Sequence, residues 1–140
     1  GLVYSASWRG REVAVKRLRT DNSVERSARR AKRFIAEMRM MAGLGHAHVV
    51  EFLGGCLEQG SLCAVHELCR ASLDAVLHGQ CVVHPRAPIP PAVRLQWAAE
   101  VASGIAYLHG LDPPVVHRDL KSGNVLLTHG WVAKVADFGA

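Results

Sequence analysis

The 140-residue sequence lacks several features that mark other classes of protein. It has no apolar run long enough to span a bilayer, which argues against a transmembrane helix in this segment. No Gly-Lys-Ser or Gly-Lys-Thr triplet occurs, so the chain is not a P-loop nucleotide-binding protein. No segment repeats at any period, which excludes a solenoid or a propeller. We therefore expect a globular protein, about half of whose residues are apolar.

The cysteines of the chain offer no zinc site. None stands in a Cys-x-x-Cys pair or at another spacing typical of zinc ligands. We expect reduced, largely buried thiols, which favours an intracellular location, cytoplasmic or nuclear, for a protein that could be anchored to a membrane outside this segment. The four residues are Cys56, Cys63, Cys69 and Cys81.

Aromatic residues are scarce, at 6% of the chain, whereas basic charge is concentrated. The formal net charge is +5, and one segment of eight residues carries Arg26, Arg29, Arg30, Lys32 and Arg33. Such a run is typical of contact with nucleic acid or a membrane, or of a solvated helix face. No aromatic residue interleaves with these charges, as a stacking surface would require. We therefore favour the solvated face and expect neither a nucleic-acid partner nor membrane contact.

The first half of the chain predicts an antiparallel sheet with one helix packed on it. Alternating apolar residues favour two hairpins. Their strands are expected at 3–8, 13–16, 49–56 and 62–67, with turns at Arg9-Gly10 and Gln59-Gly60. Between the hairpins, apolar residues recur at helical spacing and predict a helix that ends at Gly43. The recurring residues are Ala31, Phe34, Ile35, Met38, Met41 and Ala42.

The second half is expected to be mainly helical, with one further hairpin. Ser72 is a suitable N-cap for a short helix at 73–78. A longer amphipathic helix is predicted at about 92–109, opened by Pro91 and closed by Gly110. We expect its apolar stripe to be left without a partner inside the chain. The stripe comprises Trp97, Val101, Ile105 and Leu108. The third hairpin is expected to pair strands at 125–127 and 132–135 across a turn at Thr128-His129-Gly130.

Polar residues gather at the joints between these elements, where functional residues concentrate. The strongest cluster is the run 117–124, and a second is Asp-Phe-Gly at 137–139. A third pairs Lys16, at the end of a strand, with Glu37 of the predicted helix. Such a set suits phosphoryl transfer, whose transition state is loose, negatively charged and stabilised mainly by positioned charge.

Each residue type in these clusters has a chemical use in that reaction. Asn124 and Asp137 offer the hard oxygen ligands that Mg²⁺ prefers. The carboxylate of Asp119 can orient a hydroxyl group and accept its proton. Lys16 and Lys121 offer compact positive charges to phosphate oxygens.

The motifs resemble the protein kinase signature set in its proper order. His-Arg-Asp-Leu-Lys-Ser-Gly-Asn occupies 117–124, Asp-Phe-Gly begins at 137, and Val-Ala-Val-Lys occupies 13–16 with a helical Glu following. The resemblance covers the whole chain and implies a eukaryotic-type protein kinase domain of α+β, bilobal fold, truncated. It implies a small lobe over 1–67, formed by an antiparallel sheet and one helix. This small lobe lacks its first strand. The hinge and the first part of a mainly helical large lobe are expected over 68–140, ending just after Asp-Phe-Gly.

The resemblance also assigns roles to single residues. The catalytic set would be Asp119 as base, Lys121 at the γ-phosphate, and Lys16 at the α- and β-phosphates, paired with Glu37. The nucleotide-binding set would be Gly1, Val3, Ala14, Lys16, Glu67, Cys69 and Leu126, with His66 as gatekeeper. The metal ligands would be Asn124 and Asp137, while Met41, His117 and Phe138 would belong to a hydrophobic stack.

The implied activity is transfer of the ATP γ-phosphoryl group to serine or threonine hydroxyls of protein substrates, with Mg²⁺ as cofactor. Lys121, two residues after the base, resembles the motif of serine/threonine kinases. The sequence pattern around Val3 to Lys16 resembles that of the tyrosine-kinase-like group. Both ends look like cuts, so we expect these residues alone to be inactive. The alternative is a non-catalytic nucleotide-binding or scaffold protein of the same fold. Such proteins usually lose the lysine, the base or the magnesium aspartate, and here Lys16, Asp119 and Asp137 are all present.

Overall fold

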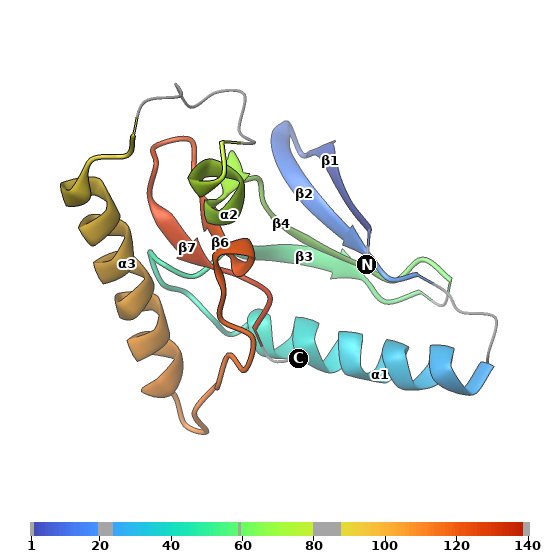
Figure 1. Ribbon diagram of the computed structural model, residues 1–140. Coiled ribbons are helices and arrows are strands. Elements are labelled where there is room, and N and C mark those ends of the chain that lie inside the picture. The colour runs from blue at the N-terminus through green and yellow to red at the C-terminus, as the bar shows by residue number, and fades with distance from the viewer. Residues whose placement is uncertain (1, 20–23, 59, 80–87, 139–140) are drawn as a thin grey trace. The chain divides into compact units, whose positions relative to one another are not determined.

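The computed structural model describes residues 2–19, 24–58, 60–79 and 88–138 (Figure 1). The chain divides into two compact units. The first comprises Gly1–Gly45 and Glu51–Leu68, and the second comprises His46–Val50 and Cys69–Ala140. No helix among the described residues has both the length and the apolar composition needed to cross a membrane.

The first unit is built on a four-stranded antiparallel sheet in the order β1-β2-β4-β3. Its strands are β1 (Leu2–Trp8), β2 (Arg11–Arg17), β3 (Phe52–Cys56) and β4 (Cys63–Glu67). The turn between β1 and β2 is formed by Arg9 and Gly10, both with positive φ, at 51° and 75°. Two successive positive φ values are typical of a type I′ turn, whose twist matches that of paired strands. Both hairpins predicted in this half are confirmed.

One helix, α1 (Val24–Met41), lies alongside this sheet (Figure 1). Its buried residues are Phe34, Met38 and Met41, spaced three and four apart as one helical face requires. Met38 comes so close to Gly55 of β3 that a Cβ at Gly55 would collide with its methyl group. The predicted stripe is therefore confirmed in its centre, whereas Ala42 is exposed. The five basic side chains of 26–33 are exposed, as expected for a solvated helix face.

The second unit contains a three-stranded antiparallel sheet in the order β5-β6-β7. The strands are β5 (Ala71–Ser72), β6 (Val125–Leu127) and β7 (Ala133–Val135). The helices are α2 (Leu73–Leu77) and α3 (Pro91–His109), and a 3-10 turn spans Ser122–Asn124. The Ser72 hydroxyl accepts a hydrogen bond from the Ala75 amide at 3.2 Å, which confirms the predicted N-cap.

The expectation that the α3 stripe lacks a partner within the chain is wrong. Trp97 is 3% exposed and Leu108 is fully buried. Trp97 packs with residues of the β6–β7 hairpin, and its indole nitrogen donates to the Trp131 carbonyl at 2.8 Å. The hairpin thus covers Trp97 and contacts Val101, which were expected to be covered from outside the chain, while Val101 and Ile105 remain partly exposed. The buried cluster comprises Val76, Ile89, Trp97, Val125, Leu127 and Ala133.

The expected strand at 49–56 is shorter than predicted, because β3 begins only at Phe52. The preceding segment pairs instead with β7 in the second unit. Val49 forms a parallel bridge with Val135, the Val50 amide donates to the Val135 carbonyl at 3.0 Å, and the Val135 amide donates to the His48 carbonyl at 2.9 Å. The apolar run is thus divided between two sheets.

Candidate functional site

Lys16 and Glu37 meet on one face of the first sheet. Lys16 lies near the end of β2, and its Nζ is 3.7 Å from Oε1 of Glu37 on α1. The two side chains are 25% and 20% exposed, so both are partly withdrawn from water. The predicted ion pair is therefore confirmed. Removing one partner would leave the other charge partly buried and without this ion pair.

Val3 and Ala14 share the sheet face on which Lys16 lies. Val3 is the cross-strand partner of Lys16, and Ala14 precedes Lys16 by two residues on β2. Cross-strand partners, and residues two apart along a strand, project from the same face. Val3 is 65% exposed, so an apolar surface beside the Lys16 charge is open to solvent.

Glu67 ends β4 and is tied to the segment before β3. Its amide donates to the Glu51 carbonyl at 3.1 Å, and its side chain accepts from the Glu51 amide at 2.8 Å. The preceding residue, His66, packs edge-on against Phe52 with ring centroids 5.6 Å apart. These contacts fix the end of β4 at the place where the chain leaves the first unit.

In the second unit, Asp119, Lys121 and Asn124 form a tight polar cluster. The Lys121 Nζ donates to Oδ2 of Asp119 at 2.8 Å. The Asn124 Nδ2 donates to the same oxygen at 3.0 Å and to the Asp119 carbonyl at 2.8 Å. The Asp119 and Lys121 side chains remain more than half exposed, at 54% and 59%. The cluster therefore presents an oriented carboxylate to solvent.

The hydrogen bond from Lys121 lowers the pKa of Asp119 below its ordinary value of 3.8, with smaller help from Asn124 and opposed by desolvation. The carboxyl group is consequently ionised throughout the neutral range. An ionised carboxylate can accept a hydrogen bond from a hydroxyl group and later its proton.

Buried contacts hold this cluster against the segment that follows β7. The His117 ring nitrogen Nε2 donates to the Ala136 carbonyl at 2.9 Å, and Nδ1 accepts from the Asp119 amide at 3.3 Å. His117 is 3% exposed and Phe138 is 2% exposed, and their rings pack edge-on with centroids 6.2 Å apart. His117 therefore has a structural role, as expected from the sequence.

The backbone also joins Asn124 to the residue before Asp137. The Ala136 amide donates to the Asn124 carbonyl at 2.9 Å. Asp137 has a φ of 53°, a left-handed conformation uncommon for a residue other than glycine. This geometry turns the chain sharply at the exposed carboxylate of Asp137.

Asn124 and Asp137 suit a magnesium ion better than a metal whose ligands are all supplied by the protein. The Asn124 side chain makes its two hydrogen bonds to Asp119 through its nitrogen Nδ2, so its side-chain oxygen Oδ1 is the atom suited to ligation. No three His, Cys, Asp or Glu side chains gather into a metal-binding group among the described residues. Mg²⁺ commonly takes one or two protein oxygens and completes its shell with water and phosphate oxygens.

The whole chain, residues 1–140, matches a family model described as protein tyrosine and serine/threonine kinase. The chain belongs to the protein kinase family. The resemblance stated from the motifs is thereby confirmed, and with it the fold class.

Relatives of this kinase chain include proteins named as serine/threonine kinases. Probable serine/threonine-protein kinase drkA of Dictyostelium discoideum is 40% identical over 146 residues, covering 99% of this chain and 21% of that protein. Human mitogen-activated protein kinase kinase kinase 10 is 40% identical over 149 residues, which cover 99% of this chain and 15% of that protein. Serine/threonine-protein kinase CTR1 of Arabidopsis thaliana is 39% identical over 140 residues, covering 99% and 16%. The chain therefore spans about a fifth or less of the length of these relatives.

The kinase motifs are divided between the two units. The first unit holds Val3, Ala14, Lys16, Glu37 and Glu67, and the second holds Cys69, Asp119, Lys121, Asn124, Leu126 and Asp137. Gly1 lies outside the described residues. The structure brings Lys16 and Glu37 together in the first unit, and Asp119, Lys121 and Asn124 together in the second. The roles assigned to these residues, and the adenine-binding roles of the set Val3, Ala14, Glu67, Cys69 and Leu126, stay predictions.

One contact of the segment 117–124 was not foreseen from the sequence. The Ser122 hydroxyl donates to Oδ1 of Asp74 on α2 at 2.7 Å, and so anchors the turn between Lys121 and Asn124. A serine and an aspartate that lie 48 positions apart give no local signal that they are partners.

Proposed function

We propose that the full-length protein containing this chain is an ATP-dependent protein kinase that phosphorylates serine and threonine hydroxyls. The observation that carries the proposal is the cluster in which Lys121 and Asn124 hold the Asp119 carboxylate ionised and exposed. A positioned carboxylate beside a positive charge is what an incoming hydroxyl and a phosphoryl group require.

In this proposal, the Asp119 carboxylate orients the substrate hydroxyl and takes its proton as the bond to phosphorus forms. Lys121, beside that carboxylate, neutralises charge on the γ-phosphate. In the first unit, Lys16 contacts the α- and β-phosphates, and its ion pair with Glu37 keeps the ammonium group in place. The apolar surface of Val3 and Ala14 on the same sheet face packs against the adenine.

Asn124 and Asp137 would hold Mg²⁺, which when bound neutralises charge on the phosphate oxygens. The protein kinase family generally uses ATP and Mg²⁺. For this chain, the support is the oxygen donor set and the use of the Asn124 side-chain nitrogen Nδ2 in both hydrogen bonds to Asp119, so that the side-chain oxygen Oδ1 is the atom suited to ligation.

The proposal is tested by Asp119→Asn in the full-length protein. Loss of the base should lower the phosphotransfer rate by about 10²-fold or more while nucleotide affinity is retained. Asp112→Asn is the matched control, because it removes the same charge from an exposed position seven residues earlier. Turnover at the wild-type rate in the Asp119 variant would contradict the assignment. Nucleotide binding without turnover in the wild type would favour the scaffold alternative.

Serine or threonine as acceptor is supported by Lys121 and by the names of the relatives, which are described as serine/threonine kinases. A degenerate peptide library incubated with the full-length protein should yield phosphoserine and phosphothreonine. Phosphotyrosine as the sole product would overturn the acceptor assignment without affecting the role of Asp119.

A further inference from the structure

Two cysteines stand directly opposite each other in the first sheet. Cys56 is the last residue of β3 and Cys63 the first of β4, and the two are cross-strand partners. Both are half-buried and present as free thiols. They form the final pair of the ladder, followed only by the loop that joins the strands.

The alternation of side chains places this pair on the face of the sheet away from α1. The neighbouring pair, Gly55 and Ala64, faces α1, because a Cβ at Gly55 would collide with Met38. Successive side chains project from opposite faces of a strand. Cys56 and Cys63 therefore lie on the face opposite that of Lys16, outside the catalytic site proposed above.

The separation of directly opposite residues suits a disulfide bond. In an antiparallel ladder the Cα atoms of such a pair are about 4.5 or about 5.5 Å apart. Both values lie within the roughly 4.4–6.8 Å that disulfides span. The Cβ atoms of opposite residues are about 4.5–5.5 Å apart, so closing the bond needs a movement of about 1 Å. The pair is the last of the β3–β4 ladder, so no β3–β4 pair lies beyond it to be disturbed, and Cys63 keeps Arg17 as its partner on β2.

We propose that Cys56 and Cys63 form a dithiol that is oxidised to a cross-strand disulfide by exchange with a small disulfide such as oxidised glutathione. One protein thiol loses its proton, attacks the small disulfide and releases one thiolate, giving a mixed disulfide. The second protein thiol loses its proton and attacks the protein sulfur of that mixed disulfide, releasing the second thiolate. Two electrons pass to the oxidant, and two protons convert the released thiolates to thiols.

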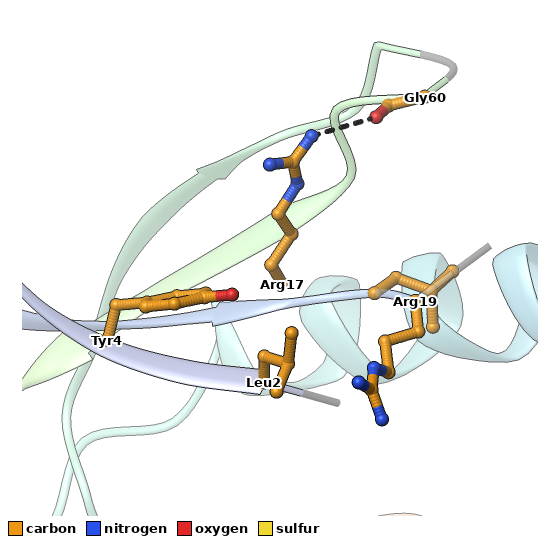
Figure 2. Close-up of a pocket in the computed structure, with 6 residues that line it drawn as sticks. Leu2, Tyr4, Arg17, Arg19 and Gly60 are labelled. Carbon is orange, nitrogen blue, oxygen red and sulfur yellow. Dashed lines mark hydrogen bonds between the residues drawn. The ribbon is translucent and has the colours of Figure 1, made fainter.

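The surroundings of the pair favour an anionic disulfide. Arg17 is the β2 partner of Cys63 and therefore projects from the same face. Figure 2 shows Arg17 reaching toward Gly60, whose carbonyl accepts from it at 3.4 Å, with Tyr4 and Arg19 lining the same pocket. This pocket has a volume of about 260 Å³. Oxidised glutathione carries carboxylates, which guanidinium groups bind well.

The experiment uses the reduced full-length protein equilibrated with oxidised and reduced glutathione at a series of ratios. Remaining thiols are alkylated, and a protease that cuts after glutamate then separates the two cysteines at Glu58. We expect a peptide pair joined through Cys56 and Cys63, two hydrogens lighter than the separate thiol peptides and released by reductant. The two singly alkylated peptides should disappear in parallel as the linked pair forms.

Three variants make the test decisive. In Cys56→Ser or Cys63→Ser the remaining thiol should end as a glutathione adduct with no linked peptide. Cys69→Ser, which alters a half-buried cysteine of the second unit, should form the linked pair as the wild type does. Separate glutathione adducts on both cysteines of the wild type would overturn the proposal. So would persistence of both free thiols at ratios that modify Cys69, or a disulfide from either cysteine to a different partner.

Discussion

Gly104 of α3 lies close against the backbone at His48, and we predict that replacing it with alanine destabilises the second unit. A Cβ at position 104 would lie closer than 3.0 Å to the His48 carbonyl oxygen and 3.1 Å from Cγ2 of Val135. Backbone atoms cannot rotate away as the end of a long side chain can. The helix would have to withdraw from the segment that pairs with β7.

Three terms set the size of the effect. Overpacking of a tight contact costs about 1–3 kcal/mol. The hydrogen bonds that join His48 and Val50 to Val135 would be weakened, at about 1 kcal/mol each if lost. Alanine returns about 1 kcal/mol, because it is the better helix former. We therefore expect a net loss of about 2 kcal/mol.

The assay is reversible unfolding of the 140-residue chain in a Trp8→Phe background, so that fluorescence reports on the second unit through Trp97 and Trp131. The predicted loss corresponds to a fall in Tm of about 8 °C. Ser103→Ala is the control, since that neighbouring position is exposed and should change stability by less than about 0.5 kcal/mol. An alanine variant as stable as the wild type, or more stable, would refute the close approach.

Three further predictions concern the polar and charged residues of the proposed site. Lys16→Met and Glu37→Gln should each lower the phosphotransfer rate, by about 10²-fold for the lysine variant. The rate of the double variant should be little lower than that of Lys16→Met. Full additivity of the two effects on the activation free energy would argue against the ion pair. Lys121→Met should raise the pKa of Asp119 toward 3.8, because it removes the largest cause of the lowering. Since the pKa of Asp119 in the folded protein lies below 3.8, the contacts of this carboxylate stabilise the fold above pH 3.8, and that stabilisation is lost as the pH falls through the folded-state pKa. A carboxyl-carbon NMR titration that shows no upward shift of the Asp119 pKa in the Lys121 variant would contradict the prediction. Asn124→Ala should raise the Mg²⁺ concentration needed for half-maximal rate, and an unchanged requirement would remove Asn124 from the metal site.

Local signals were sufficient to predict the hairpins of the first unit. The turn at Arg9 and Gly10 was predictable because glycine adopts positive φ without strain and alternating residues flank it. The Ser72 cap was predictable for a similar reason, since the donor and the acceptor lie only three residues apart. In both cases the chemistry that fixes the structure is contained in a short window of sequence.

The start of α1 could not be located in the same way. The helix begins at Val24, well before the first residue of the predicted stripe, and its first ten residues include none that are buried. The segment is rich in arginine and alanine, which are good helix formers. Helix propensity, rather than periodic burial, therefore extends α1 beyond the sheet-facing part, and an apolar pattern carries no information about such an extension.

The division of 49–56 between two sheets depends on partners far away in the chain. Val49 and Val50 read as the start of a strand that continues into β3, yet they pair with Val135. The bonds are between backbone groups, which every residue carries, so side-chain identity cannot reveal them. The prediction for the α3 stripe was wrong for the same reason. The apolar face of the helix could be recognised in the sequence, but the packing of the hairpin against Trp97 could not.

The candidate catalytic residues were predictable as a set because their order and spacing match a family, but their geometry depends on contacts that no motif displays. Asp119 and Lys121 remain more than half exposed, whereas His117 and Phe138 beside them are almost fully buried. Of this buried pair, His117 donates to the Ala136 carbonyl, a backbone group of the residue just before Asp137. Replacing His117 should therefore disturb Asp119 and Asp137 together, while replacing Lys121 should disturb Asp119 alone. In the function proposed above, the exposed charges would supply the chemistry, and the buried ring and backbone contacts would determine where that chemistry takes place.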